Sequence, residues 1–553
     1  MTSESRTPGH GSGLDRRTFL QLSAIGGATF ATASVTACQS GRRTGEKPAA
    51  ANVPAFELDE ITIAELSEGM ESGRFTARSL CEMYLDRIEQ LDHAGPSLHA
   101  MLDLNPDALD IAAQLGRERA DAGVRGPLHG IPVIVKDNIG TADRMTTTAG
   151  SYALEGSIPS RDAFVARRLR EAGAIILGKA NLSEWANFRS TNSSSGWSGR
   201  GRQCRNPYAL DRSPCGSSSG TAAAIAANYA AVGIGTETDG SVVCPSAANG
   251  LVGIKPTVGL VSRSGIVPIA HSQDTAGPMA RTVRDAAILL GTMVGIDPED
   301  RATKTHAGRG VSDYTKFLDA DGLRGARIGV ARKRYFGYST YADDVVEEAV
   351  RRMSLLGADI IDPADIDTAG DWSDAEFDVL LYEFKADLNA YLESLGPSAP
   401  VKSLAEIIAF NERNRDREMP FFGQEIMTMA QEKGPLTDPA YATALEKSRR
   451  LTRSEGIDAV MARHNLDALI APTGSPAWTI DLINGDHFLG SSSSPAAVSG
   501  YPNITVPAGE AFGLPIGISF FGREFSEPKL LRLAYAFEQA TGARAAPGFK
   551  ASV

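Results

Sequence analysis

The run Gly130-Ile131-Pro132-Val133-Ile134-Val135-Lys136 decides the fold class of this chain. An unbroken apolar run of this length predicts a strand that is buried on both faces. A second such run, at 174–177, follows a predicted helix at 162–172. A strand, a helix and a strand with short connections predict a parallel strand pair, and therefore a protein of the α/β class.

The rest of the chain continues this alternation on both sides of a long helical stretch. We predict helices at 61–69 and 76–91, with Thr76 as the N-cap of the second. Residues 330–460 are mostly helical and polar, and we expect them to form a cap-like region. The other predicted elements are a helix at 222–231, strands at 468–470, 503–506 and 516–521, and a helix at 529–540. Since no repeat or second domain boundary is evident, we expect a single domain over residues 56–546.

Composition excludes two classes of protein. The chain has 553 residues, of which 42% are hydrophobic and 22% charged, and its formal net charge is −12. This is the profile of a soluble globular protein. An acidic chain is unsuited to nucleic acid, because the phosphate backbone requires clustered lysine and arginine. No run after residue 40 approaches the ~20 apolar residues that cross a bilayer.

The N-terminus is typical of an exported lipoprotein. Asp15-Arg16-Arg17-Thr18-Phe19-Leu20 matches a twin-arginine signal, and an apolar stretch follows it up to Ala37. Small residues then lead to Cys38, as they do before a lipidated cysteine. We therefore expect residues 1–37 to be a signal peptide and residues 38–55 a tether. The mature protein is expected on the outer face of a bacterial membrane, held only by a lipid on Cys38, or else secreted.

Cysteines and histidines give no evidence of a disulfide framework or a metal site. Besides Cys38 the chain has four cysteines, at 81, 204, 215 and 244, which is too few for such a framework. A bridge between Cys204 and Cys215 stays open, but buried free thiols are favoured. No HExxH motif occurs among the eight histidines, so we expect neither a metal nor a cofactor.

Three short segments carry the candidate chemistry. Lys136 ends the apolar strand, where a charge is unfavourable unless it has partners or a function. Ser217 lies in the loop Cys215-Gly216-Ser217-Ser218-Ser219-Gly220, just before a predicted helix. Ser241 ends the glycine-rich run 233–241. Each segment alone is a weak signal, but Ser217 follows Lys136 by 81 residues and Ser241 follows Ser217 by 24.

This order and spacing resemble the amidase signature family. The similarity extends from about Ile61 to Thr541 and includes the segments 274–282, 468–473 and 500–509. The resemblance implies an α/β/α sandwich around a large twisted mixed sheet. It also implies amide hydrolysis in which Ser241 is the nucleophile, Ser217 a bridging serine after a cis peptide bond, and Lys136 the base. The implied oxyanion hole consists of the backbone amides of Thr238, Asp239, Gly240 and Ser241.

Physical chemistry sets one condition on such a relay. A serine hydroxyl attacks an amide only when a base removes its proton. Lysine is a base only when it is neutral, so its pKa must fall well below the usual value of about 10.4. Burial at a strand end lowers a lysine pKa in this way. His129 and His271 are not needed, and we expect structural roles for both.

The chain departs from the common family pattern beside the nucleophile. Glu237 and Asp239 stand where the family usually has aspartate and glycine, and Val243 replaces the usual arginine. This variant resembles the bacterial peptide amidases, which remove the C-terminal amide of peptides. Whether Asp239 stabilises the lysine charge or contacts substrate stays open.

Three alternatives for the activity remain open. The relay also suits an ester, carbamate or aryl-acylamide hydrolase. An amidotransferase A-subunit has the same fold, although the export signal argues against it. A lipid-anchored, non-catalytic binding protein on this fold is the alternative from another class. The expected partner is a small-molecule or peptide amide, and the oligomeric state stays open.

Overall fold

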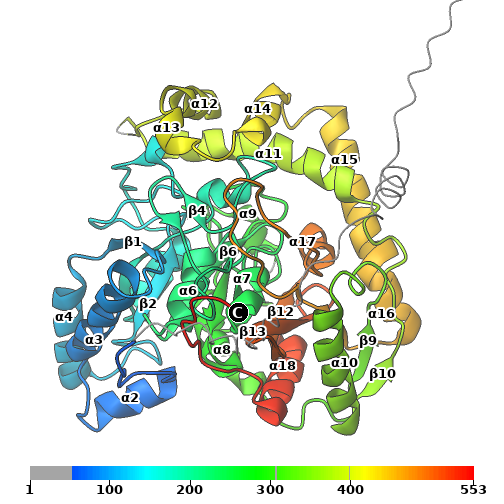
Figure 1. The fold of residues 1–553 in the computed structure, drawn as a ribbon, viewed down its shortest axis with the longest axis horizontal. Helices are drawn as coiled ribbons and strands as arrows, with labels where there is room; N and C mark the ends of the chain where they lie inside the picture. Colours follow the sequence, from blue (N-terminus) through cyan, green and yellow to red (C-terminus); the bar gives the residue numbers. More distant parts are fainter. Residues whose placement is uncertain (1–52, 306–307, 398) are drawn as a thin grey trace, which may run out of the picture. The chain divides into compact units, whose positions relative to one another are not determined.

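Strand β2 (Pro132–Lys136) is the buried strand that the sequence predicts, and all five of its residues are buried. In the computed structural model it pairs in parallel with β3 (Ile175–Ala180), and α5 (Phe164–Glu171) lies between them in sequence. The predicted strand, helix and strand are therefore confirmed. The structure describes residues 53–553 except 306, 307 and 398 (Figure 1). The predicted signal at 1–37 and nearly all of the tether lie outside the described residues.

The centre of the fold is a mixed sheet of eleven strands. Their order is β1-β3-β2-β6-β8-β7-β12-β13-β11-β9-β10. Strand β2 pairs in parallel with both of its neighbours, β3 and β6, and β9 pairs in parallel with β10 and β11. All the other neighbouring strands are antiparallel. The remaining strands are β1 (Met101–Leu104), β6 (Val232–Glu237), β7 (Val252–Lys255), β8 (Thr275–Ala280), β9 (Arg327–Val330), β10 (Asp359–Ile361), β11 (Ala468–Pro472), β12 (Asn503–Ala511) and β13 (Leu514–Phe521). A separate hairpin pairs β4 (Trp197–Ser198) with β5 (Arg202–Gln203).

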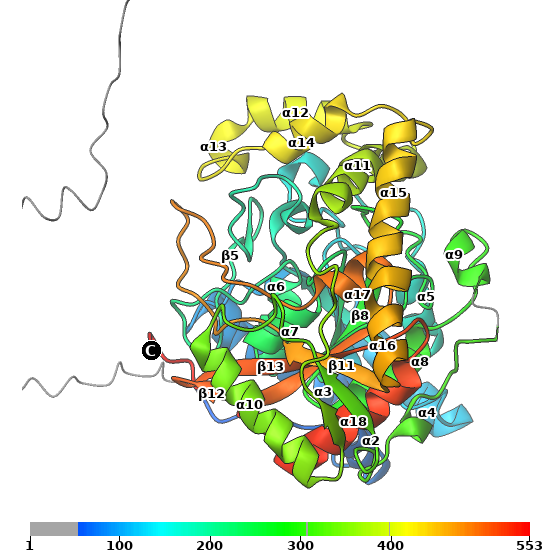
Figure 2. The same ribbon diagram turned by 90° about the vertical axis from the view of Figure 1, so that its right-hand side faces the viewer.

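Helices cover both faces of the sheet, which gives the expected α/β/α sandwich. Figure 2 shows α6 and α7 on one side of the strands, and α10 and α18 on the other. These and the other helices outside the cap are α2 (Ile63–Glu71), α3 (Ala77–Ile88), α4 (Ala108–Ala122), α6 (Ser219–Ala226), α7 (Val243–Ala248), α8 (Val283–Met293), α9 (Arg301–Lys304), α10 (Thr340–Leu355), α16 (Asp458–His464), α17 (Ser494–Ser499) and α18 (Glu527–Thr541). No helix among the described residues is long and apolar enough to cross a membrane.

Small residues let α6 lie directly on the sheet. All eight residues of α6 are buried, and a Cβ added at Gly233 of β6 would lie 2.7 Å from Thr221 of this helix. The prediction of a helix at 222–231 is wrong at its end. The helix stops at Ala226, and Asn228 adopts a positive φ of 63° that a continuing helix does not allow.

The cap is smaller than the predicted region at 330–460. It consists of α11 (Ser373–Ser394), α12 (Leu404–Arg413), α13 (Arg415–Glu418), α14 (Glu425–Glu432) and α15 (Pro439–Thr452). Figure 1 shows these helices together at one end of the molecule. The helix α10 packs against the sheet, and β10 is its edge strand, so both belong to the sandwich. Only one face of α10 is buried, which leaves its other face polar.

Candidate active site

One strand end and two loops at the same edge of the sheet bring the predicted site residues together. Lys136 is the last residue of β2, and β6 runs parallel beside it, so both strands end at the same edge. Ser241 lies in the loop between β6 and α7. Ser217 lies in the loop that leads into α6, and the backbone amide of Ser218 donates to the carbonyl oxygen of Ser241 at 3.2 Å. The two serine loops are therefore joined directly.

Lys136 is fully buried and has three hydrogen-bond partners. Its Nζ lies 2.7 Å from Ser217 Oγ, 3.2 Å from Thr236 O and 2.9 Å from Thr236 Oγ1. The amide Nδ2 of Asn138 also donates to Thr236 Oγ1, at 2.9 Å. The threonine oxygens therefore act as acceptors, and each of them takes one N–H of the lysine.

Burial changes the acidity of this lysine. Desolvation lowers the pKa of Lys136 from 10.5 to about 7, although the charges of Asp274 and Glu237 oppose the shift. A large fraction of Lys136 is therefore neutral near pH 7. This meets the condition that the sequence sets for a lysine base.

Ser217 and Ser241 are placed differently with respect to Lys136. The peptide bond between Gly216 and Ser217 is cis, as the resemblance implies. Ser217 Oγ contacts the lysine, whereas no side-chain hydrogen bond joins Ser217 to Ser241 in the described structure. Ser241 instead faces a cavity, of which it is a lining residue. The structure thus brings Lys136 and Ser217 into direct contact and places Ser241 in the adjoining loop.

The predicted oxyanion loop, Thr238–Ser241, is held on its outer side. Thr238 Oγ1 donates to Asp274 Oδ1 at 2.6 Å, and the other oxygen of Asp274 accepts from the amides of Ile269 and Ala270. Within the described residues, no group accepts a hydrogen bond from the backbone amides of Asp239, Gly240 and Ser241. These three donors are therefore available to a substrate oxygen.

Glu237 explains how the site tolerates the missing arginine. Its Oε2 accepts from the backbone amides of Val242 and Val243 at 2.8 and 3.0 Å. Burial raises the pKa of Glu237, against the effect of these amides and of the charge on Lys255. In the family pattern an arginine acts on the acidic residue at this position. Here the backbone amides at the start of α7 and the more distant charge of Lys255 act on the Glu237 carboxyl instead.

A disulfide joins the two serine loops. The structure pairs Cys215 with Cys244, with a Cα–Cα distance of 6.0 Å, and leaves Cys81 and Cys204 as buried free thiols. The sequence favoured four buried free thiols, and this prediction is wrong for Cys215 and Cys244. The Cys204–Cys215 bridge that the sequence left open does not form. The pairing depends on loops that meet only in the folded chain, and sequence spacing does not reveal this.

The cavity in front of Ser241 has a volume of about 300 Å³. Aromatic and aliphatic side chains and the disulfide form much of its wall, and Asp239 and Asp486 are its charged lining residues. No lysine or arginine of the described chain lines it. The apolar lining residues include Phe188, Ile269, Leu380, Trp478 and Phe488. The cavity is therefore suited to an apolar group and offers no cation to a carboxylate.

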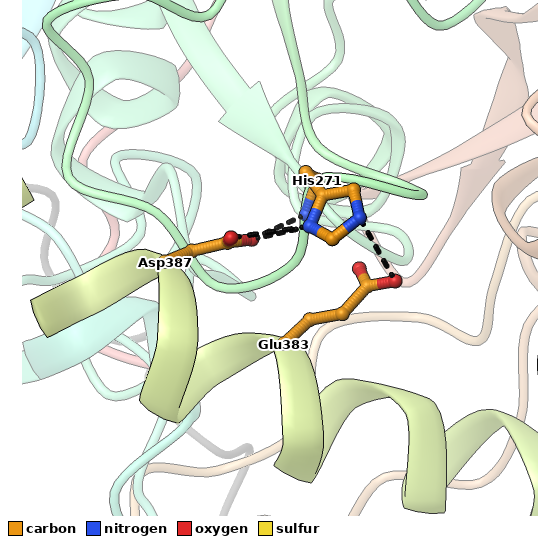
Figure 3. Close-up of side chains that lie close together, drawn as sticks. All are labelled: His271, Glu383 and Asp387. Atoms are coloured by element: carbon orange, nitrogen blue, oxygen red, sulfur yellow. Dashed lines mark hydrogen bonds and ion pairs between the residues drawn. The ribbon is translucent and has the colours of Figure 1, made fainter. Parts of the chain in front are cut away.

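A second cavity, of about 460 Å³, shares Ala186, Thr238 and Ile269 with the first. At its edge, His271 Nδ1 lies 2.9 Å from Asp387 Oδ2, and His271 Nε2 lies 3.5 Å from Glu383 Oε1 (Figure 3). The two ring nitrogens face different carboxylates. The arrangement is that of a protonated imidazole paired on both sides, and it ties the segment before β8 to α11.

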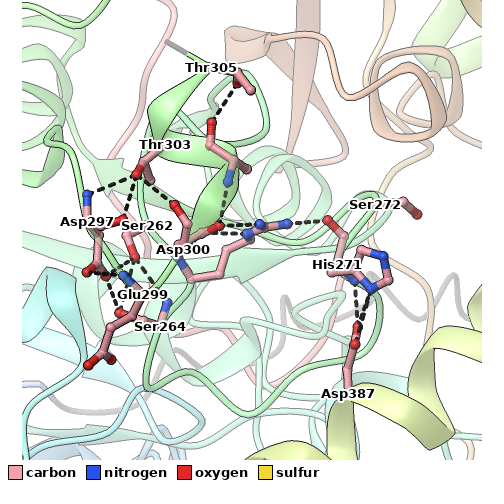
Figure 4. Close-up of polar contacts among 12 residues, drawn as sticks. Ser262, Ser264, His271, Ser272, Asp297, Glu299, Asp300, Thr303, Thr305 and Asp387 are labelled. Carbon is pink, nitrogen blue, oxygen red and sulfur yellow. Dashed lines mark hydrogen bonds and ion pairs between the residues drawn. The ribbon is translucent and has the colours of Figure 1, made fainter. Parts of the chain in front are cut away.

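The same segment is anchored on its other side. Arg263 Nε donates to Asp300 Oδ2 at 2.8 Å, and its guanidinium also donates to the carbonyl of His271. Asp297 accepts from Ser262 and Ser264 close by (Figure 4). The segment that carries His271 and Asp274 is thereby fixed from both ends.

Sequence reasoning missed several residues that contact the predicted site. Thr236 follows the strand pattern of β6 and showed no sign of its contact with Lys136. Asp274 stood within a matching motif without an assigned role. The other missed residues are Glu376, Ser493 and Ser494, which reach Asp239 from α11 and α17. Nothing in the sequence around these three distinguishes them from surface residues.

Comparisons with known proteins agree with this geometry. A family model described as Amidase matches residues 79–531. A probable amidase of Arabidopsis thaliana is 44% identical over 501 residues, which cover 89% of this chain and 92% of the plant protein. The solved native peptide amidase from Stenotrophomonas maltophilia is 52% identical, with a TM-score of 0.85, and the match covers 90% of this chain and 100% of that one. The glutamyl-tRNA(Gln) amidotransferase A-subunit of Thermoanaerobacter pseudethanolicus is 36% identical, over 89% of this chain and 99% of its own length.

Proposed function

This chain belongs to the amidase family and hydrolyses carboxamide C–N bonds, and from that premise we propose that Lys136, Ser217 and Ser241 form its catalytic relay. The observation that carries the proposal is the 2.7 Å contact between Ser217 Oγ and a buried lysine whose pKa falls to about 7. A neutral amine has two N–H groups and one lone pair. Since Thr236 O and Thr236 Oγ1 accept the two N–H groups, the lone pair is left to face Ser217.

The proposed reaction then proceeds in two halves. Ser241 Oγ attacks the carbonyl carbon and passes its proton to Ser217, which passes its own proton to Lys136. The amides of the loop at 238–241 stabilise the oxyanion, a contribution on the order of a hundredfold or more per donor. The relay returns the proton to the departing nitrogen, and the C–N bond breaks to leave an acyl-enzyme on Ser241. Water, activated by the same relay, releases the acid.

Substitution of the three residues tests the relay. We expect Ser241→Ala to abolish hydrolysis, and Lys136→Ala to lower kcat by about 10³-fold or more. Ser217→Ala is expected to cost as much as Lys136→Ala or somewhat less. Ser475→Ala is the matched control, because within the described chain this hydroxyl donates to the carbonyl of the next residue, Pro476, and to no site residue. Circular dichroism checks that each variant folds, and full activity in Lys136→Ala would refute the relay.

For the substrate, we propose the C-terminal amide of peptides with an apolar last side chain. The apolar wall of the cavity at Ser241 supports this, as does the similarity to a peptide amidase. The absence of a lining lysine or arginine argues against glutamine, whose α-carboxylate would enter without a partner. Ammonia release is measured from peptide amides, glutamine, aryl amides and carbamates, with acid release from esters in parallel. A preference for glutamine or for esters would contradict the assignment.

We further propose that the protein is exported and lipid-anchored through Cys38. The order of Arg16-Arg17, the apolar stretch and Cys38 supports this, and the Cys215–Cys244 disulfide is usual in an oxidising compartment. Fractionation of cells expressing wild type and Cys38→Ala tests it. We expect membrane-associated activity for wild type and soluble, exported activity for the variant. Activity confined to the cytoplasm in both would refute export.

A further inference from the structure

Asp239, which replaces the usual glycine of the oxyanion loop, accepts hydrogen bonds from two serines that lie outside this loop. Its Oδ1 accepts a hydrogen bond from Ser493 Oγ at 2.5 Å, and its Oδ2 accepts one from Ser494 Oγ at 2.6 Å. Both serines stand at the start of α17, a segment more than 250 residues further along the chain. The carboxylate therefore ties the loop to another part of the sandwich.

The cap supplies a third contact. Glu376, in the first turn of α11, forms a side-chain hydrogen bond with Asp239. Two carboxyl groups can share such a bond only when one of them holds a proton. Burial and the charge on Asp239 raise the pKa of Glu376 well above its usual value, so Glu376 is the partner that holds it. Asp239, with two serine hydroxyls donating to it, holds the negative charge.

Gln273, a buried residue of the segment before β8, completes the network. Its Nε2 donates to Glu376 Oε1 at 3.1 Å and to the carbonyl oxygen of Thr238 at 3.3 Å. The loop is also held by close packing, because a Cβ added at Gly240 would lie 3.0 Å from Ser493 Oγ. The residues on either side of the oxyanion amides are therefore fixed by α17, by α11 and by the segment before β8.

We propose that Asp239 and Glu376 are positioning residues, a hydrogen-bonded acid pair that aims the oxyanion amides and makes their alignment depend on the docking of the cap helix α11. The inference rests on the proposed function of the same site. It gives Asp239 a role besides the two that the sequence leaves open. Because the serines and Glu376 hold its carboxylate from outside the loop, Asp239 fixes the loop, although it also lines the cavity in front of Ser241.

Substitutions at Glu376 separate its hydrogen bond from its charge. Glu376→Gln keeps a donor for Asp239 and an acceptor for Gln273, so we expect kcat within about threefold of wild type. Glu376→Ala removes both, and we expect kcat to fall by about 10- to 100-fold with little change in KM, since misplacement of catalytic groups by ~1 Å costs up to a hundredfold. Asp239→Asn is expected to show a similar loss of kcat. Glu393→Ala, at an exposed position of the same helix, is the control.

The alkaline side of the pH profile is the readout that a purely structural role would not change. Loss of the Glu376 proton places two negative charges together, so wild-type kcat should fall at high pH, while Glu376→Gln should keep its kcat there. The other groups that act on the pair are Ser493 and Ser494 of α17, Gln273, Lys255 of β7, Glu237 of β6 and Tyr335. All of these groups are unchanged in Glu376→Gln. A difference in the alkaline part of the kcat–pH profile between wild type and this variant therefore reports the proton on Glu376.

The results of the Glu376 variants can be told apart from the results expected if the proposed relay of Lys136, Ser217 and Ser241 is wrong. Labelling of wild-type Ser241 by a fluorophosphonate, followed by intact mass, reports the nucleophile whether or not Glu376 acts on the loop. Wild-type kcat in Glu376→Ala, or the same alkaline limb in Glu376→Gln as in wild type, would overturn the inference. If Glu376→Ala does not fold, the limb in Glu376→Gln still decides. A wild-type enzyme that hydrolyses amides without being labelled at Ser241 would instead refute the proposed relay.

Discussion

Lys136 shows how the contacts of a single residue set its chemistry. Lys136 lies at the end of a buried strand, where its amine is shielded from water. Among the described residues, no carboxylate forms a hydrogen bond with this amine. Asp274 and Glu237 act on it only through space, so desolvation determines its pKa. A direct ion pair at this position would keep the lysine charged, and a charged lysine cannot accept a proton from Ser217.

This residue predicts the acidic side of the activity profile. The pKa of about 7 means that Lys136 is neutral above this pH and protonated below it. We therefore expect kcat to rise with pH through about 7 and to level off just above it, before the fall at high pH that the Asp239–Glu376 pair predicts. Measurement of kcat against pH on a peptide amide checks this. A profile that stays flat down to about pH 5 would show that the base is another group or has an ordinary carboxylate pKa.

At the scale of elements, the disulfide is the covalent link between the loops that carry the two serines. Cys215 stands two residues before Ser217, and Cys244 three residues after Ser241. The bridge spans a separation of 29 residues. Closing a loop of this size is expected to stabilise the fold by about 3–4 kcal/mol, chiefly by restricting the unfolded chain.

Reduction of this link is therefore expected to act on stability and on activity. We predict a lower Tm and a lower kcat when wild type is treated with a reductant under conditions that break the bridge. A double variant, Cys215→Ala with Cys244→Ala, should show both effects without reductant and no further response to it. Cys204→Ala, which removes a buried free thiol, should respond to reductant as wild type does. An unchanged Tm for reduced wild type would contradict the prediction.

At the scale of the whole described unit, α11 connects the cap to the proposed oxyanion loop and to the segment before β8. Glu376 reaches Asp239, and two turns further along, Glu383 and Asp387 hold His271. Tyr441 of α15 also donates to Glu383 at 2.6 Å, so a second cap helix joins this contact. A shift of the cap would therefore act both on the loop at 238–241 and on the segment before β8.

The His271 contact predicts a pH dependence of stability. Burial lowers the pKa of His271, but the hydrogen bond to Asp387 and the charges of Glu383 and Asp387 outweigh it, so the net shift is upward. A raised pKa means that the stabilisation is full below the unfolded value of 6.5 and is lost as pH rises through the folded value.

We therefore expect His271→Gln to destabilise the protein more at about pH 6 than at about pH 9. The measurement is the free energy of unfolding in urea at both pH values. His464→Gln, on α16 and away from this contact, is the matched control. Equal destabilisation by His271→Gln at the two pH values would show that the imidazole is not charged in the folded protein.

The sequence alone determined the α/β class, the parallel pair β2 and β3, and the segments that hold Lys136, Ser217 and Ser241. It did so because periodicity and glycine-rich loops are local properties, and the order of the three segments is a property of the chain itself. Even so, local signals misplaced the end of α6 and the start of the cap.

Tertiary structure alone decided which groups surround the relay. Thr236 meets Lys136 because β6 pairs with β2, and Cys244 meets Cys215 because two loops end at one edge of the sheet. Glu376 and Ser493 reach Asp239 from distant parts of the chain. Such contacts depend on the order of strands and on the docking of helices, which are set by packing over the whole domain and have no signature at the residues themselves.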